Sequence, residues 1–282
     1  MDYSDIRSLV IVSLFAEDQL LDILVLKGGN AINLIYGYGS RSSLDIDCSI
    51  DGDFANPDEV GAILHRALQT RFRERGMDVF DFTFRQKPSS PRAEINDRWG
   101  GYAAEFKIID QVQLDRTGNI EQMRRTALEI GPQHQRTFRV DFSKYEFCDQ
   151  KRQGELNDYA IFVYTPEMLS IEKLRAICQQ MEEYPLQRHR TPRARDFYDI
   201  HVVLKEGEID WGTPHCIDLA RNIFAAKEVP PQLIQLIPRY RDFHQQDWPS
   251  VENSVSGRLE DFDFYVDFLV EESIKLQPLW VV

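Results

Sequence analysis

The alternation of apolar and polar residues predicts several strands in the first half of the chain. Residues 44–50 alternate at period two, so as a strand they turn Asp45 and Asp47 to one face and their apolar neighbours to the other. Similar extended patterns predict strands over 79–84, 102–109 and 137–142. Apolar residues at helical spacing predict helices over 6–21, 32–36, 58–75 and 120–129. The first half is therefore predicted to combine helices with a sheet.

The second half has a different pattern, because apolar residues recur at helical spacing almost throughout. Thr165 and Pro166 supply a side-chain cap and a favourable first residue for a helix. Helices are predicted over 166–182, 193–205, 213–226, 230–237 and 258–275. The polar stretch 149–158 separates the two patterns, so we predict one domain over 1–155 and a helical domain over 156–282. The predicted fold class is α+β.

Composition and charge limit the classes of partner. The 282 residues are 43% hydrophobic and 28% charged, which is an ordinary globular composition with room for two domains. A net charge of −13 argues against a protein that grips nucleic acid along a broad basic face. Basic clusters at 71–75, 124–125 and 188–195 still allow a polyanion to dock locally, although such clusters are also typical of solvated surfaces.

The sequence also indicates where the protein works. Its longest apolar runs fall well short of the about 20 residues that a membrane span needs, and the acidic segment 1–5 does not resemble the start of a signal peptide. The cysteines lack the spacing of a zinc site or a redox pair, so we expect reduced, buried thiols. We therefore expect a cytoplasmic protein.

Asp45 and Asp47 are the first candidates for chemistry. Two carboxylates on one face can hold two divalent ions roughly 3.5–4 Å apart, the arrangement that stabilises attacking and leaving oxygens in phosphoryl transfer. Gly28 and Gly29 stand just upstream, and only glycine lets backbone amides approach a polyphosphate without an intervening Cβ. Asn30 begins a predicted helix whose N-terminal amides favour an anion. Each feature is common by itself, but the ordered combination of Gly-Gly, helix, Arg41-Ser42 and D-x-D within about 25 residues favours a metal site.

Two pairs of segments carry a family resemblance. Residues 27–34 followed by 41–50 resemble the first motif of the DNA polymerase β-like nucleotidyltransferases, in the variant of the AbiEii/AbiGii toxin family. Residues 165–176 and 192–200 are similar to the E-K-L-R-A and R-D-x-x-D patterns of that family's second domain. Shorter similarities lie at 99–102 and 262–265. The chain departs from many members of the superfamily by having Gly-Gly-Asn in place of Gly-Ser. The question of which groups bind the phosphates therefore stays open.

The resemblance implies a fold and an activity. The expected architecture is a nucleotidyltransferase domain with a mixed β-sheet, followed by a helical C-terminal domain. The expected enzyme depends on two Mg²⁺ ions and moves a nucleoside monophosphate from an NTP to an acceptor, which is RNA such as tRNA, or protein. The family further implies a toxin of a toxin–antitoxin or phage-defence system, with a cognate antitoxin as partner. The alternative is a catalytically inactive module that binds nucleotide or a protein partner and regulates without turnover.

A third carboxylate is expected beside Asp45 and Asp47, because two metal ions need more oxygen ligands than two side chains provide. Asp141 and Glu105 both lie on the polar side of predicted strands. The strand that holds Asp141 resembles the family's third-carboxylate strand more closely, so Asp141 is favoured. The predicted metal ligands are thus Asp45, Asp47 and Asp141, and the alternative with Glu105 stays open.

Further site residues follow from the resemblance. It places Lys173 and Asp196 beside the catalytic site, where the lysine would neutralise charge on the triphosphate. Lys173 lies on an otherwise apolar helix, so a salt bridge to Asp196 or Asp199 explains it equally well. Arg195 either pairs with Asp199, four residues on, or contacts phosphate. The predicted nucleotide-binding residues are Lys27, Gly28, Gly29, Asn30, Arg41, Ser42 and Arg195.

Overall fold

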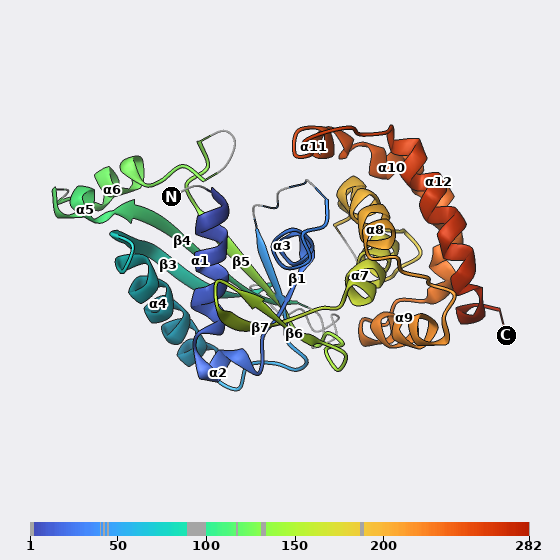
Figure 1. The fold of residues 1–282 in the computed structure, drawn as a ribbon, viewed down its shortest axis with the longest axis horizontal. Coiled ribbons are helices and arrows are strands. Elements are labelled where there is room, and N and C mark those ends of the chain that lie inside the picture. Colours follow the sequence, from blue (N-terminus) through green and yellow to red (C-terminus); the bar gives the residue numbers. More distant parts are fainter. Residues whose placement is uncertain are drawn as a thin grey trace. The chain divides into compact units, whose positions relative to one another are not determined.

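The computed structural model describes residues 3–39, 41, 43, 45–88, 100–116, 118–130, 134–186 and 189–281 (Figure 1). The chain forms two compact units, each made of several segments. Unit 1 comprises Met1–Asn30, Leu44–Tyr145 and Gln153–Val163, and unit 2 comprises Ala31–Ser43, Glu146–Arg152 and Tyr164–Val282. Unit 1 holds the sheet, and unit 2 is mainly helical.

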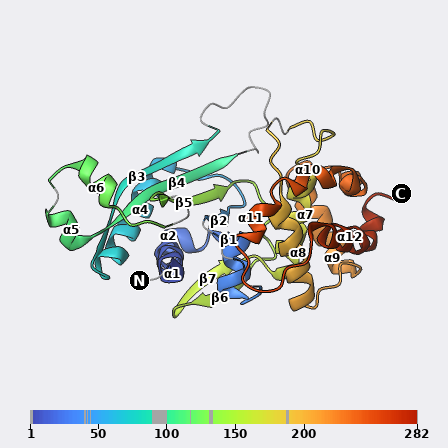
Figure 2. The same cartoon turned by 90° about the horizontal axis from the view of Figure 1, so that it is seen from above.

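A seven-stranded sheet forms the centre of unit 1 (Figure 2). Its strands are β1 (Val25–Lys27), β2 (Ile46–Ser49), β3 (Met77–Lys87), β4 (Gly101–Asp110), β5 (Phe138–Ser143), β6 (Arg152–Leu156) and β7 (Tyr159–Val163). The strand order is β3–β4–β5–β2–β1–β7–β6. The sheet is mixed, because β1 pairs antiparallel with β2 but parallel with β7, and β2 pairs parallel with β5. The prediction of an α+β fold with a mixed sheet is confirmed.

The two faces of the sheet follow from the alternation along its strands. In β5 the apolar residues Phe138, Val140 and Phe142 are buried. Arg139 and Asp141 alternate with them and are partly exposed on the opposite face. The apolar face therefore contributes to the core of unit 1, and the polar face carries the carboxylates.

Helices α1 (Tyr3–Phe15) and α4 (Pro57–Arg73) pack beside each other in unit 1. The side chain of Asn56 caps the start of α4. This helix packs closely on β3, since a Cβ at Gly61 would lie 3.1 Å from the Phe84 side chain. Shorter helices in unit 1 are α2 (Asp18–Leu21), α3 (Gly28–Asn30), α5 (Gln111–Arg116) and α6 (Ile120–Thr126). The predicted helix over 6–21 is thus divided into α1 and α2.

Unit 2 is built around helix α7 (Pro166–Cys178), which is buried on nearly every side. Thr165 caps this helix as predicted, because its Oγ1 accepts a hydrogen bond from the Met168 backbone N–H at 3.3 Å. Helices α8 (Ala194–Glu206) and α9 (Pro214–Ala226) pack against α7. Unit 2 also contains η1 (Ala31–Ile35), η3 (Pro231–Tyr240), α10 (Arg241–Gln245), α11 (Trp248–Glu252), α12 (Phe262–Ser273) and η4 (Ile274–Leu279).

The structure differs from the sequence prediction near the polar stretch 149–158. Strands β6 and β7 lie at one edge of the sheet, and the turn residues Asn157 and Asp158 between them have φ of 51° and 67°. A polar edge strand lacks the apolar alternation that identifies a strand, so its pattern indicates a linker instead. The division into domains 1–155 and 156–282 stays a prediction. In the described segments, no helix has both the length and the apolar character needed to cross a membrane.

Candidate functional site

Asp47 lies in the middle of a row of polar residues on three adjacent strands. In the sheet register, Asp47 of β2 is opposite Lys27 of β1 on one side and Asp141 of β5 on the other. Register partners project from the same face, so all three residues lie on the polar face of the sheet. Lys27 is buried, whereas Asp47 and Asp141 are partly exposed. The row places a cation and a carboxylate each one strand spacing, about 4.8 Å, from Asp47.

The register also distinguishes the two candidates for the third carboxylate. Asp141 stands on the strand next to Asp47, whereas Glu105 stands on β4, beyond β5 in the sheet. Glu105 is opposite Arg139, so it is one strand farther from Asp47 and displaced along the sheet. Asp141 is therefore the closer candidate, and its role as a metal ligand stays a prediction.

Asp141 is held by cations on the same face. Arg139 Nη2 donates to Asp141 Oδ1 at 2.7 Å, and Lys87 Nζ lies 3.9 Å from the same oxygen. Lys87 Nζ also lies 3.8 Å from Glu105 Oε1. Burial alone would lower the pKa of Arg139, but its hydrogen bond to Asp141 and the carboxylate charges around it raise that pKa. The protein itself therefore orients the Asp141 carboxylate.

A glycine turn lies directly against Asp47. Gly28 follows β1 with a φ of +70°, a conformation that other residues rarely adopt. A Cβ at Gly28 would come within 2.5 Å of Asp47 Oδ2. Gly29 and Asn30 are buried and complete α3. The structure thus brings the predicted phosphate-binding turn and the D-x-D strand together in unit 1.

The residues at this turn fit a divalent cation in part. Carboxylate oxygens are ligands that Mg²⁺ prefers, and Asp45 and Asp47 supply them from neighbouring positions. Glycine at position 28 makes room for the Asp47 carboxylate beside the turn. Among the described residues, however, no group of three or more His, Cys, Asp or Glu side chains converges as a metal site. Water molecules or phosphate oxygens of a nucleotide would therefore complete the coordination.

Asn30 connects the glycine turn to the D-x-D strand. Its Nδ2 donates to the Asp45 backbone carbonyl at 2.7 Å, and its Oδ1 accepts a hydrogen bond from Arg7 Nη1 at 3.1 Å. The Asn30 side chain is buried, so a nucleotide contact by this residue would fall to its backbone. Arg7 is missing from the sequence-based site, although a charged residue within the apolar helix over 6–15 is the signal that identifies it.

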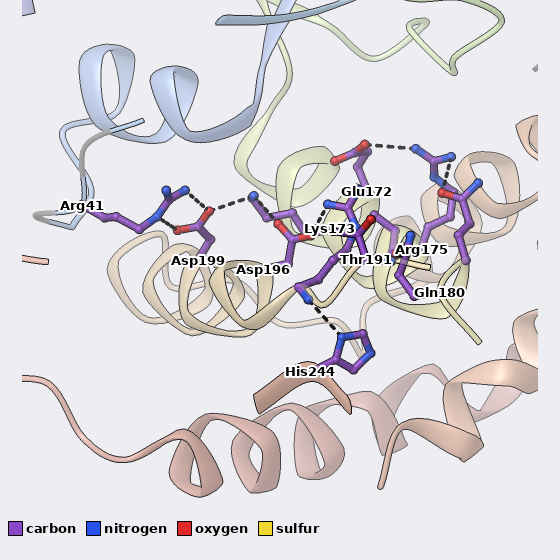
Figure 3. Close-up of polar contacts among 12 residues, drawn as sticks. Arg41, Glu172, Lys173, Arg175, Gln180, Thr191, Asp196, Asp199 and His244 are labelled. Carbon is purple, nitrogen blue, oxygen red and sulfur yellow. Dashed lines mark hydrogen bonds and ion pairs between the residues drawn. The ribbon is translucent and has the colours of Figure 1, made fainter. Parts of the chain in front are cut away.

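A second group of predicted residues forms an ion network in unit 2 (Figure 3). Arg41 donates two hydrogen bonds to Asp199, of 2.8 and 2.6 Å. Lys173 Nζ lies 2.8 Å from both Asp199 Oδ2 and Asp196 Oδ1. All four side chains are buried, and Arg193 Nη1 donates a further hydrogen bond of 2.8 Å to Asp196 Oδ2. The salt bridge considered for Lys173 is confirmed, with both carboxylates as partners.

Mutual charge pairing keeps Asp199 and Lys173 ionised. Burial alone would raise the pKa of Asp199, but the charges of Arg41 and Lys173 hold it well below its usual value. Burial alone would lower the pKa of Lys173, but Asp196 and Asp199 raise it above its usual value. A catalytic role for Lys173 and Asp196 stays a prediction. Ser42, the neighbour of Arg41, lies outside the described residues.

Arg195 lies on the exposed side of α8. Its Nε donates to Ser250 Oγ of α11 at 2.9 Å. The ion pair of Arg195 with Asp199 that the spacing allows is not found among the side chains the structure describes. Arg41 and Lys173 pair with the Asp199 carboxylate instead. The alternative of a phosphate contact by Arg195 stays a prediction.

The sequence matches a known family over most of its length. The profile described as nucleotidyl transferase AbiEii toxin, of type IV toxin–antitoxin systems, matches residues 10–268. The chain therefore belongs to the AbiEii nucleotidyl transferase toxin family. A comparison with curated protein sequences gave no match.

Solved structures share the fold over nearly the whole chain. The crystal structure of JHP933 from Helicobacter pylori is 15% identical with a TM-score of 0.52, and the match covers 98% of this chain and 93% of that chain. MenT4, the nucleotidyltransferase toxin Rv2826c from Mycobacterium tuberculosis H37Rv, is 11% identical with a TM-score of 0.52. That match covers 98% of this chain and 82% of the MenT4 chain. At such low identity these likenesses establish the fold alone.

Proposed function

We propose that this member of the AbiEii family is a Mg²⁺-dependent nucleotidyltransferase that transfers a nucleoside monophosphate from an NTP to RNA such as tRNA, or to protein. The observation that carries the proposal is the row of Lys27, Asp47 and Asp141 across three strands, with Gly28 against the Asp47 carboxylate. The proposed protein is cytoplasmic and acts as the toxin of a toxin–antitoxin or phage-defence system, opposed by a cognate antitoxin. Membership of a nucleotidyl transferase toxin family supports the activity and the toxin role.

The proposal assigns metal binding to Asp45, Asp47 and Asp141. Two Mg²⁺ ions bound there would stabilise the charge that develops on the phosphates of the NTP. The register of β2 with β5 supports the inclusion of Asp141, because Asp141 stands opposite Asp47. Arg139 supports it as well, since its hydrogen bond of 2.7 Å fixes the Asp141 carboxylate on the polar face.

The phosphates of the NTP are assigned to Gly28, Gly29 and Asn30. These residues form the whole of the short helix α3, which continues into η1, and backbone N–H groups at the start of a helix favour an anion. Lys27 is buried on the strand opposite Asp47. Its ammonium group would offset the negative charge of the carboxylates and the phosphates. The turn and the lysine together would orient the NTP.

The proposed reaction joins an acceptor hydroxyl to the α-phosphorus of the NTP. The hydroxyl oxygen forms a bond to that phosphorus, the bond from the phosphorus to the oxygen that bridges to the β-phosphate breaks, and pyrophosphate leaves. We assign removal of the hydroxyl proton to the carboxylate of Asp141, which is partly exposed on the polar face. Orientation and charge stabilisation by the glycine turn and Lys27 would supply most of the remaining rate enhancement.

In unit 2 the proposal assigns catalytic roles to Lys173 and Asp196, and nucleotide contacts to Arg41, Ser42 and Arg195. Arg195 is exposed, which supports its assignment to a nucleotide contact. A guanidinium has five N–H donors, and the hydrogen bond to Ser250 Oγ uses the one on Nε. Lys173 and Asp196 are assigned from the motif resemblance. Their burial as an ion pair gives them a stabilising role as well.

The test is incubation of the purified protein with each α-³²P-labelled NTP, Mg²⁺ and a total cell extract. Label that ribonuclease releases identifies an RNA acceptor, and label that protease releases identifies a protein acceptor. The proposal expects one of these results, and it expects labelling to stop when EDTA removes Mg²⁺. Absence of label from both fractions with every NTP would contradict the proposal and favour the inactive nucleotide-binding module.

A further inference from the structure

Arg7 is a buried cation in a helix whose inner side is otherwise largely apolar. Helix α1 buries Ile6, Val10 and Ile11 around it, and the Arg7 side chain is only 4% exposed. Burial of a guanidinium costs free energy unless hydrogen bonds compensate, whereas leucine or methionine would pack there without that cost. The arginine therefore points to a specific contact.

One contact of Arg7 is to Asn30, and it determines how the Asn30 amide is oriented. An arginine side chain has only donors, and Arg7 Nη1 donates to Asn30 Oδ1 at 3.1 Å. With its oxygen fixed in this way, the amide presents Nδ2 to the Asp45 backbone carbonyl and donates to it at 2.7 Å. A flipped amide would set its NH₂ group against the guanidinium, so Arg7 disfavours that orientation.

The second of these hydrogen bonds holds the entry to the D-x-D strand. β2 begins at Ile46, so Asp45 precedes the paired part of the strand, and Asp45 is exposed. A hydrogen bond from a buried amide to the Asp45 carbonyl therefore restrains the backbone from which the first carboxylate projects. Asp47 follows two residues later on the same face.

Tyr3 contacts the same guanidinium. The Arg7 guanidinium carbon lies 5.2 Å from the centre of the Tyr3 ring, a cation–π contact. Burial raises the pKa of Tyr3 to about 12, while the charge of Arg7 lowers it and the charge of Asp45 raises it. The cation–π contact with Tyr3 helps to hold the Arg7 guanidinium in place.

We propose that Arg7 is a positioning residue for the D-x-D carboxylates: through the Asn30 amide it fixes the Asp45 backbone, and so organises the carboxylate pair for a divalent cation. The inference rests on the proposed function, in which these carboxylates bind metal. Contacts that orient metal ligands commonly change metal affinity by about 10- to 100-fold.

The test measures binding of Mn²⁺, a paramagnetic substitute for Mg²⁺, to the full chain by electron paramagnetic resonance without nucleotide. Arg7→Met and Asn30→Ala should each weaken Mn²⁺ binding about 10- to 100-fold. Because both changes break one pathway, the double variant should bind no more weakly than the more affected single variant. Arg7→Lys keeps a cationic donor and should recover part of the affinity.

Lys144→Met is the matched control. Lys144 is also a buried cation of unit 1, and its Nζ lies 2.8 Å from Asp53 Oδ2. This change should lower thermal stability and leave Mn²⁺ binding unchanged, which separates positioning from general destabilisation. Wild-type affinity in a folded Arg7→Met protein, or additive effects of the two single changes, would overturn the inference. If Arg7→Met does not fold, the Asn30→Ala titration decides, since wild-type affinity there overturns the inference equally.

Failure of the proposed function has a different signature. If Mn²⁺ binds the wild type no better than it binds Asp47→Ala, the carboxylates hold no metal, and both proposals are wrong. If Asp47→Ala abolishes binding and Arg7→Met leaves it unchanged, only the positioning role is wrong.

Discussion

Gly28 lies directly against the carboxylate of Asp47. A Cβ built on Gly28 would stand 2.5 Å from Asp47 Oδ2, closer than real Cβ atoms come to other heavy atoms. Gly28 also has a φ of +70°, which strains any residue with a side chain. The backbone conformation and the place of the Asp47 carboxylate, a predicted metal ligand, both favour glycine at position 28.

Gly28→Ala should abolish nucleotidyl transfer and lower stability by more than its backbone conformation explains. Gly76→Ala is the matched control, because Gly76 has a φ of +72° but nothing within 4 Å of the added Cβ. The control should cost about 1–2 kcal/mol through its left-handed conformation and keep full activity. Chemical denaturation and label transfer are the measurements. Equal activity in the two variants would contradict a functional contact between Gly28 and Asp47.

Asp141→Asn should lower turnover about 100-fold or more, because it removes the proposed third carboxylate and proton acceptor. Glu105→Gln is the control and should leave turnover largely unchanged, since Glu105 is one strand farther from Asp47. Asp141→Asn and Glu105→Gln each remove one carboxylate partner of Lys87. The effect of losing a partner of Lys87 is therefore common to both variants and does not explain a difference in their turnover. A larger loss in Glu105→Gln would move the site to β4.

Lys173→Met should unfold at a lower denaturant concentration than the wild type. The change removes a shared partner of the buried Asp196 and Asp199, and breaking a buried ion pair from one side costs about 3–5 kcal/mol. Lys205→Met, at an exposed position of α8, is the control and should cost at most about 1 kcal/mol, the scale of the exposed cation–π contact that Lys205 makes with the Phe268 ring.

Turnover measured on the same preparations separates the two roles of Lys173. Loss of turnover in protein that is still folded supports the proposed contact with the triphosphate. Lower stability with turnover preserved assigns Lys173 to the ion network alone. A variant as stable and as active as the wild type would refute both roles.

The local sequence pattern was sufficient to predict the D-x-D strand and the glycine turn. Alternation places Asp45 and Asp47 on one face whatever the rest of the fold does, and a Gly-Gly pair before a helix indicates a turn by itself. The pairing of Asp47 with Asp141 is different, because it joins two parallel strands from distant parts of the chain. No local periodicity sets that register, so the choice between Asp141 and Glu105 needed the sheet order.

Buried charges were the part of the site that local pattern could not assign. Helical spacing allows Arg195 to pair with Asp199, but Arg41 reaches the carboxylate from a distant segment with two hydrogen bonds. Strand β1 has three residues, too few for alternation to show that Lys27 is buried. Arg7 stands out in an apolar helix, but its partner depends on how the chain folds back.

Lowering the pH from about 6.5 towards 4 should destabilise the protein through His244. This residue is fully buried, and its Nδ1 accepts a hydrogen bond from the Arg193 backbone N–H at 3.1 Å. Burial lowers the pKa of His244 from 6.5 to about 4. The unfolded chain therefore takes up a proton at a higher pH than the folded chain. The contribution of neutral His244 to the free energy of unfolding is complete above pH 6.5. It is lost as the pH falls from 6.5 to about 4, and the total loss is about 3 kcal/mol.

Urea unfolding above, within and below this pH window measures the effect. His244→Asn keeps an acceptor close to the Arg193 N–H and should remove this part of the acid destabilisation. Carboxylates contribute to the pH dependence of unfolding in both the wild type and the variant. The difference between the two pH dependences therefore isolates the contribution of His244. An identical pH dependence in wild type and variant would contradict the assignment.

The most direct test of the central claim is label transfer from an α-³²P-labelled NTP by Asp45→Ala and Asp47→Ala. Each variant should lose transfer and remain folded, because removing one carboxylate dismantles the metal site without removing any apolar core contact. Asp51→Ala, at an exposed position just after β2, should keep both activity and stability. Full transfer by either Asp45→Ala or Asp47→Ala in the presence of Mg²⁺ would contradict the account.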